Sequence, residues 1–190
     1  LQSDIFSITA NVLDDINVSI VNVNVTLPNL EVIQDTLTDD DSDHVYNFTF
    51  VNTSQVGTYT IVIFANDTSN NINSSETVDF NVQDSGAPLV KLISPINNTI
   101  SNINEINFTC NASDGTGLSN ISLYTNITGS FVATQIDNIS GILNQTNFTL
   151  TSLSEGEYIW NCEANDSSGN KAFDILNRTF FVDTTYPNVT

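Results

Sequence analysis

The chain of 190 residues nearly repeats itself at a spacing of 99 to 100 residues. Residues 57–68 and 156–167 share the frame Gly-x-Tyr, followed six residues after the Tyr by Ala-Asn-Asp. Residues 6–12 align with residues 106–112 at the same spacing. A period near 100 residues is too long for a solenoid repeat and is about the length of one β-sandwich domain. The sequence therefore predicts two copies of one fold in tandem.

Within each repeat, apolar and polar residues alternate along short segments. Ile106, Phe108 and Cys110 are separated by Asn and Thr, and residues 158–164 have the same period. A period of two is typical of a strand with one buried and one solvated face. Clusters of Asp, Asn, Gly and Ser separate these segments, and no segment has a helical stripe. We therefore predict an all-β fold of short antiparallel strands with hairpin and Greek-key connections.

The repeat also predicts the domain boundaries, with residues 1–84 forming one sandwich and residues 85–184 a second. The second repeat opens with a strand over about residues 87–95, whereas the first has only nine residues before Ala10 and lacks an equivalent. Residues 185–190 match the start of such a strand. Two interpretations are open: the chain is a window from a longer array, begun by processing or excision, or the C-terminal segment of one copy completes the first domain of the next.

Several motifs of the chain carry a resemblance to a known family. They are Pro-Leu-Val-Lys-Leu-Ile-Ser-Pro (88–95), Asp-Gly-Thr-Gly-Leu-Ser (114–119), Glu-Gly-Glu-Tyr-Ile-Trp-Asn-Cys (155–162) and Ala-Asn-Asp-Ser-Ser-Gly-Asn (164–170). The chain resembles the tandem immunoglobulin-like repeats of prokaryotic, especially archaeal, cell-surface glycoproteins. The resemblance implies two immunoglobulin-like sandwiches at an extracellular, cell-surface location. It does not separate spacers, adhesins and filament or surface-layer subunits.

The only cysteines, Cys110 and Cys162, lie on the inward phase of strands that fall second and sixth in an immunoglobulin-like order. A disulfide between them would join the two sheets, as suits an oxidising compartment. The alternative is a pair of free buried thiols. The first repeat has Ala10 and Ile63 at the same positions, so the bond is optional to the fold.

Asn-X-Ser/Thr triplets, the acceptors of N-linked glycans, occur far more often than chance predicts. A shuffled chain with 28 Asn and 43 Ser plus Thr would hold roughly 6, whereas this chain holds 17, none with Pro in the middle. The excess predicts an exported protein coated with N-linked glycans. The acceptors are Asn17, Asn24, Asn47, Asn52, Asn66, Asn73, Asn97, Asn107, Asn111, Asn120, Asn126, Asn138, Asn144, Asn147, Asn165, Asn177 and Asn188.

Strand geometry predicts where these triplets point. The Asn and the Ser or Thr two residues later share one strand face, so both are expected to face outward while the middle residue faces the core. Three triplets are expected to recur in register between the repeats: Asn17 with Asn120, Asn47 with Asn147, and Asn66 with Asn165.

The charge balance limits the partners. The formal net charge is −19, with only Lys91, Lys171 and Arg178 as strong bases. Nucleic acid and anionic membrane are excluded as partners because nothing would neutralise their phosphates. Divalent cations and polycationic partners remain open. The longest apolar run, residues 61–65, is far shorter than the roughly 20 residues of a membrane span.

Two groups of carboxylates are candidate calcium ligands. Asp39, Asp41 and Asp43 have the spacing of a calcium loop, but His44 stands where such a loop requires Gly, and a solvated turn is the alternative. Asp114 and Asp166 fall in loops expected at the end where the chain enters the second domain, near Asp84. Calcium held there would stiffen the array, whereas the alternative role is capping of the loop backbone.

Nothing in the sequence predicts an enzyme. His44 is the only histidine, and the chain contains no nucleophile elbow, phosphate loop or His/Cys metal cluster. We expect a structural module, the repeating subunit of a surface filament, sheath or surface layer, with neighbouring copies or adjacent repeats as partners. The alternative is an adhesin stalk or a module that binds carbohydrate or another ligand.

Overall fold

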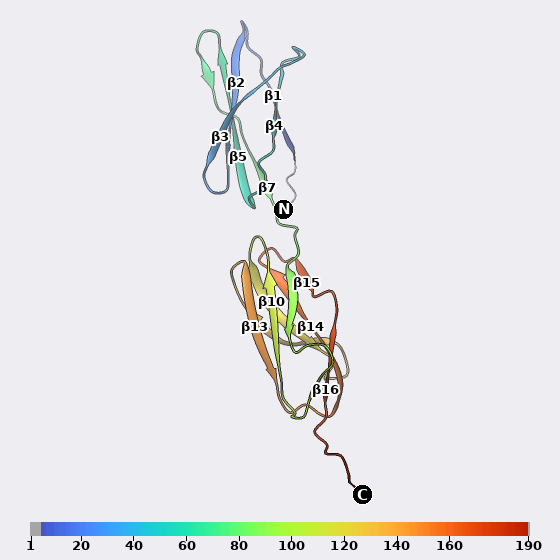
Figure 1. Ribbon diagram of the computed structural model, residues 1–190. Helices are drawn as coiled ribbons and strands as arrows, with labels where there is room; N and C mark the ends of the chain where they lie inside the picture. The colour runs from blue at the N-terminus through green and yellow to red at the C-terminus, as the bar shows by residue number, and fades with distance from the viewer. Residues whose placement is uncertain (1–4, 190) are drawn as a thin grey trace. The chain divides into compact units, whose positions relative to one another are not determined.

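A computed structural model describes residues 5–189 of the chain. The chain divides into two compact units, Leu1–Asp84 and Ser85–Thr190. Both consist of β-strands in the described residues, so the predicted all-β class is confirmed (Figure 1). No helix of the described part is long and apolar enough to cross a membrane.

The first unit is a sandwich of two sheets. Its described strands are β1 (Phe6–Asn11), β2 (Val18–Thr26), β3 (Val32–Leu37), β4 (Val45–Phe50), β5 (Gly57–Asp67), β6 (Ile72–Asn73) and β7 (Thr77–Val82). One sheet pairs β1 with β4, and the other has the order β3-β2-β5-β6, with β7 also on β5. Strand β2 shows why the sheets pack: Val21, Val23 and Val25 are buried and alternate with half-buried Asn22 and Asn24.

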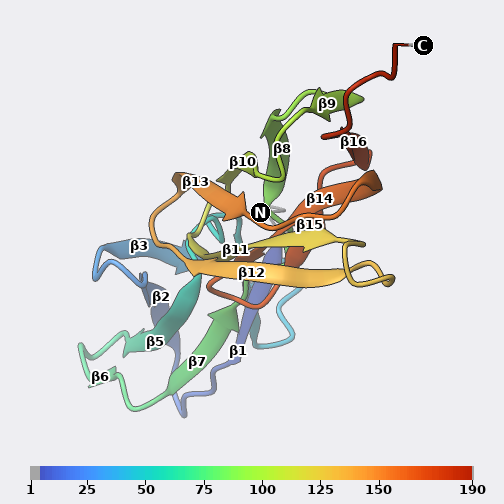
Figure 2. The same ribbon diagram turned by 90° about the horizontal axis from the view of Figure 1, so that it is seen from below.

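The second unit repeats this plan with two additional strands. It contains β8 (Leu89–Ser94), β9 (Thr99–Ser101), β10 (Ile106–Ser113), β11 (Leu118–Thr125), β12 (Val132–Asn138), β13 (Leu143–Leu150), β14 (Gly156–Asp166), β15 (Lys171–Phe173) and β16 (Arg178–Val182). The sheets are β13-β10-β8 and β12-β11-β14-β16-β9, with β15 on β14 (Figure 2). Strand β10, which carries Cys110, lies in one sheet, and β14, which carries Cys162, lies in the other; this is the immunoglobulin-like arrangement predicted for the two cysteine-bearing strands.

The core of the second unit is built around the disulfide and one tryptophan. Cys110 on β10 and Cys162 on β14 are bonded and fully buried, so the bond joins the two sheets. Trp160, also on β14, is fully buried, and its ring meets Phe108 edge-on with centroids 5.0 Å apart. These side chains fill the interior, and the predicted disulfide between Cys110 and Cys162 is confirmed.

A tyrosine closes the same turn in both units. The hydroxyl of Tyr59 accepts a hydrogen bond from the backbone N–H of Gln55 and donates one to the carbonyl of the same residue, both at 3.1 Å. The Tyr158 hydroxyl donates to the Ser154 carbonyl at 2.9 Å. A tyrosine that bonds to the backbone a few residues upstream at this corner is a recurrent device of Greek-key sandwiches. The repetition shows that the two units share corner chemistry as well as strand order.

The units differ at one edge of each of their two sheets. In the second unit, β10 pairs with β13 on one side and β8 on the other, and β9 runs parallel to β16. In the first unit, within the described residues, β1 pairs with β4 alone and β7 with β5 alone. The strands that would correspond to β8 and β9 are therefore not found in the described part of the first unit.

Candidate functional sites

The acceptor asparagines lie where sugars can be attached. None of the 17 is buried in the structure; nine are exposed and eight are half-buried. On the outer face of β10 and β13, the triplets at Asn107 and Asn147 interlock. The Thr149 hydroxyl donates to Asn107 Oδ1 at 2.6 Å, and the Thr109 hydroxyl donates to Asn147 Oδ1 at 2.8 Å. These bonds use the amide oxygens and leave the amide nitrogens, the atoms to which an N-linked glycan would be attached.

The pairing register corrects one prediction about the triplets. Asn66 lies opposite Ile20, and Asn165 lies opposite Asn120. Asn120 is therefore the counterpart of Ile20, and its predicted equivalence with Asn17 is wrong. The two triplets are alike in sequence, but Asn17 precedes β2 whereas Asn120 lies within β11. Asn165 Nδ2 donates to Asn120 Oδ1 at 3.2 Å, and a glycan on this nitrogen would leave it one N–H.

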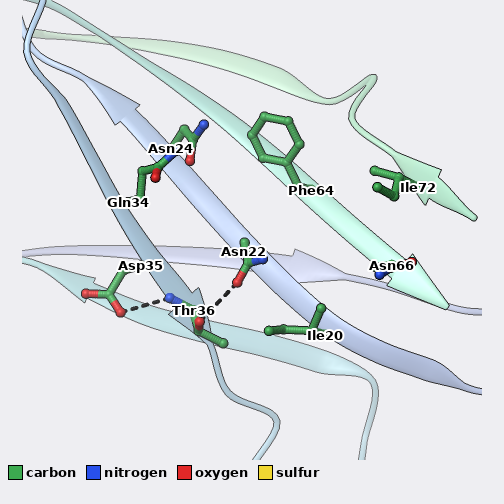
Figure 3. Close-up of a pocket in the computed structure, with 9 residues that line it drawn as sticks. All are labelled: Ile20, Asn22, Asn24, Gln34, Asp35, Thr36, Phe64, Asn66 and Ile72. Atoms are coloured by element: carbon green, nitrogen blue, oxygen red, sulfur yellow. Dashed lines mark hydrogen bonds between the residues drawn. The ribbon is translucent and has the colours of Figure 1, made fainter. Parts of the chain in front are cut away.

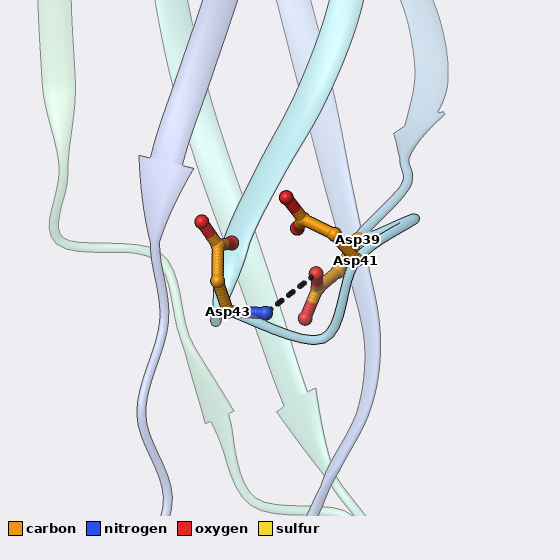
Figure 4. Close-up of side chains that lie close together, drawn as sticks. All are labelled: Asp39, Asp41 and Asp43. Carbon is orange, nitrogen blue, oxygen red and sulfur yellow. Dashed lines mark hydrogen bonds between the residues drawn. The ribbon is translucent and has the colours of Figure 1, made fainter.

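Asp39, Asp41 and Asp43 lie in the connection between β3 and β4 and bring carboxylate oxygens within 4.8 Å of one another (Figure 4). Asp39 accepts from the backbone N–H groups of Asp43 and His44 at 3.2 and 3.1 Å. The negative charge of Asp43, together with a hydrogen bond to it, raises the pKa of Asp41. His44 has a φ of 69°, a conformation that favours glycine, where a calcium loop has its Gly. This loop therefore has the hydrogen bonds of a capped turn and, in addition, a local excess of negative charge.

The second acidic group gathers at loops of the second unit. Asp166 is 2% exposed, and its carboxylate accepts from the backbone N–H groups of Ser168 and Asn170, both at 2.8 Å. Asp114 accepts from Thr116 and Gly117, and carboxylate oxygens of Asp114 and Asp166 lie within 4.8 Å of each other, whereas Asp84 is the last residue of the first unit. Burial raises the pKa of Asp114, but the hydrogen bonds from Thr116 and Gly117 outweigh it and hold this pKa below its ordinary value.

The first unit offers a comparison that isolates the turn chemistry. Asp67, the counterpart of Asp166, accepts from the backbone of Ser69 and Asn71 at 2.7 and 2.8 Å. Its side chain also accepts from Asn71 Nδ2, as Asp166 does from Asn170. Asp67 makes these bonds although it belongs to neither of the two clusters of acidic residues. Capping this loop is thus a role common to both repeats, whereas the nearby carboxylate of Asp114 distinguishes Asp166.

Calcium binding by these carboxylates stays a prediction with a direct test. If calcium binds the folded chain and not the unfolded chain, a calcium concentration of one hundred times Kd raises the free energy of unfolding by about 2.7 kcal/mol. We expect calcium to raise the midpoint of Trp160 fluorescence unfolding and Asp114→Asn to abolish the rise. Asp41→Asn reports on the other group, and Asp67→Asn is the control for lost turn capping in the first unit; both are followed by NMR of that unit, because Trp160 lies in the second. Equal midpoints of the wild-type chain in calcium and in chelator would remove calcium from the account.

Comparison with known proteins places the chain near no established family. No family model and no curated protein matches it. Among solved structures, the fibronectin(III)-like modules of Clostridium thermocellum CbhA align over 95% of this chain and 86% of that one, at 20% identity and a TM-score of 0.42. The tetra-tandem repeat in the extending region of a large adhesion protein aligns over 89% of this chain, at 19% identity and a TM-score of 0.47.

The chain spans 42% of that adhesion-protein structure, so it is shorter than the array it matches. The Ig1-Ig2 segment of Dpr2, solved in complex with DIP-Theta, aligns over 96% of this chain at 11% identity and a TM-score of 0.31. Similarities this distant do not extend to function. The immunoglobulin-like assignment rests instead on the strand order and the position of the disulfide.

Proposed function

We propose that the chain is a structural, heavily N-glycosylated extracellular module, the repeating subunit of a cell-surface filament, sheath or surface layer of a prokaryote, in particular an archaeon. The observation that carries this proposal is that 17 acceptor asparagines are distributed over two sandwiches and none is buried. A coat of this density leaves little bare protein surface, which suits a load-bearing element better than an enzyme.

The glycans have a physical task in such an element. Exposed sheet edges invite unwanted pairing with other chains, and bulky substituents on strands block it. Asn138 lies on β12 and Asn73 on β6, and both strands end the order of their sheet. Sugars also solvate a surface whose Asn, Ser and Thr replace the usual Lys and Arg.

The edge of β1 supports a way of joining modules. A strand from an adjacent repeat or a neighbouring copy would pair with β1 as β8 pairs with β10. Pro187 and Val189 correspond in the repeat to Pro88, which directly precedes β8, and to Val90, which lies within it. Residues 185–190 thus have the sequence of such a strand. Tyr186 and Val189 are 93% and 98% exposed in the structure, so these side chains are available to a partner.

Electron cryo-microscopy of material sheared from the native cell surface, with glycopeptide mass spectrometry, tests the proposal. We expect strings of sugar-bearing sandwiches with a two-domain repeat and glycans on most of the 17 asparagines. Dispersed particles, or modules confined to the tip of a larger protein, would favour the alternative of an adhesin stalk. Bare asparagines would overturn the glycosylated structural role.

A further inference from the structure

The first unit carries an open groove on the outer face of its larger sheet. The groove has a volume of about 450 Å³ and is lined by residues of β2, β3, β5 and β6. Asn24 and Gln34 face each other across β2 and β3, with the ring of Phe64 nearby on β5 (Figure 3). All its lining residues belong to the first unit, so the groove is a property of that sandwich.

The polar lining is rich in unused hydrogen-bonding groups. Asn66 Oδ1 is buried and has no hydrogen-bond partner in the structure. The side chains of Asn24 and Gln34 bond to no other group of the described chain. Three other polar lining residues are engaged with one another: Asn22 Oδ1 accepts from the Thr36 hydroxyl at 3.0 Å, and Asp35 Oδ1 accepts from the Thr36 backbone N–H at 2.8 Å. Asn165 Oδ1, at the equivalent position of the second unit, is buried and unpartnered in the same way, so the amides of Asn24 and Gln34 are the groups that distinguish the groove.

The rest of the lining is apolar or acidic. Phe64, Ile20 and Ile72 contribute a ring and two aliphatic side chains, and Asp35 contributes the single carboxylate. Amides beside an aromatic ring match a sugar, whose hydroxyls bond to amides while its C–H groups rest on the electron-rich ring face. Residues 1–84 contain no Lys or Arg, so no charge in this unit would attract an anionic saccharide.

The second unit shows what closes this face. Its register places Tyr124 where the first unit has Asn24, and Glu163 where the first unit has Phe64. The Tyr124 ring packs edge-on against Phe173, with centroids 4.8 Å apart, and also contacts Phe131. Glu163 is buried next to Tyr124, whose pKa is raised by burial, by the Glu163 charge and by the hydrogen bond between them. Aromatic rings thus occupy the part of the face that stays open in the first unit.

We propose that the groove formed by β2, β3, β5 and β6 binds a neutral saccharide, with Asn24, Gln34 and Asn66 as hydrogen-bonding groups and Phe64 as the stacking surface. Two sources supply that chemistry. One is a glycan attached at Asn24 or Asn66, which themselves line the groove; this source rests on the proposed glycosylation. The other is a saccharide of a separate molecule. In either case the same side chains of the groove contact the sugar.

The first experiment uses the full chain made without glycans and with its disulfide formed. N-acetylglucosamine, glucose, galactose and mannose are titrated to about 50 mM, a range that detects even millimolar Kd, and followed by two-dimensional NMR of side-chain amides. We expect shifts at Asn22, Asn24, Gln34 and Asn66. Gln34→Ala, at an exposed position without hydrogen bonds, should weaken binding by about two- to tenfold while leaving the fold intact.

The matched control is Ile136→Ala in the second unit. Ile136 lies opposite Ser122 as Thr36 lies opposite Asn22, so it occupies the same place on the equivalent face. This variant should bind as the wild-type chain does. No shift with any of the four sugars, or shifts confined to the second unit, would overturn the proposal.

A second experiment separates the two sources. Thr26→Ala and Thr68→Ala remove the triplets of Asn24 and Asn66 without changing a lining residue. If the attached glycan fills the groove, glycosylated wild-type chain resists added sugar and the double variant binds it. If glycosylated wild-type chain binds added sugar as well as the variant does, the natural ligand comes from another molecule. Because the first experiment uses unglycosylated chain, its failure would leave the proposed structural function standing.

Discussion

Replacing Cys110 and Cys162 together by alanine is expected to destabilise the second unit strongly and to leave the first unchanged. The bond closes a loop with a sequence separation of 52. Releasing such a loop returns about 4 kcal/mol of entropy to the unfolded chain, which lowers the midpoint of a domain of this size by tens of degrees. The first unit fills the equivalent positions with Ala10 and Ile63, so it is insensitive.

Trp160 makes this measurement specific. It is the single tryptophan of the chain and is fully buried in the second unit, so its fluorescence reports on that unit. The first unit is followed by NMR in the same samples. Wild-type chain under reducing conditions is the control that keeps both cysteine side chains and loses only the bond. A Trp160 midpoint that is the same in the oxidised chain, the reduced chain and the double variant would refute the prediction.

Adding to the first unit a strand that pairs with β1, as β8 pairs with β10, is expected to raise the stability of that unit substantially. In the proposed variant, a second copy of residues 85–105 is placed before Phe6, the counterpart of Ile106, and is joined to it directly. The register of β8 on β10 then places Leu92 opposite Ala10 and Val90 opposite Val12. Both side chains are buried in the second unit, at 4% and 5% exposure. Burying each contributes about 1.5–3 kcal/mol before the entropy of ordering the segment is subtracted.

The measurement is thermal unfolding of the first unit by NMR, with Trp160 fluorescence as the internal reference for the second. A matched control has the same extension with Val90→Asp and Leu92→Asp in the added copy, which keeps the length and removes the apolar contact. A rise with the first extension alone supports strand acceptance at β1. Equal midpoints for the two extensions would show that this edge does not accept the strand.

The sequence predicted the fold because the relevant signals are local. Alternation along β10 and β14 reports which side chains face inward, and each strand carries that information alone. Once Cys110 and Cys162 were placed on inward phases, their meeting across the sheets followed. The carboxylates of Asp114 and Asp166 were likewise expected together, because each occupies the loop that follows one of these strands.

Cross-strand register was harder to predict. The likeness of the two triplets paired Asn17 with Asn120, although these residues are 103 apart, and hydrogen bonding across the sheet sets Asn120 opposite Asn165 and Ile20 opposite Asn66. A short motif does not reveal this, because a triplet can lie before a strand in one repeat and within a strand in the other. The pairing depends on the neighbouring strand, which is distant in sequence.

The sequence by itself determined two immunoglobulin-like sandwiches, a sheet-to-sheet disulfide and a surface rich in sugar acceptors. Only the tertiary structure decided that the outer face is an open groove in the first unit and is covered by rings in the second. The physical reason is that the groove is made by side chains of four strands brought together by register. The second unit has Tyr124 where the first has Asn24, and Phe131 and Phe173 on neighbouring segments pack against that ring. These side chains change the face, while the pattern of strands is the same in both units.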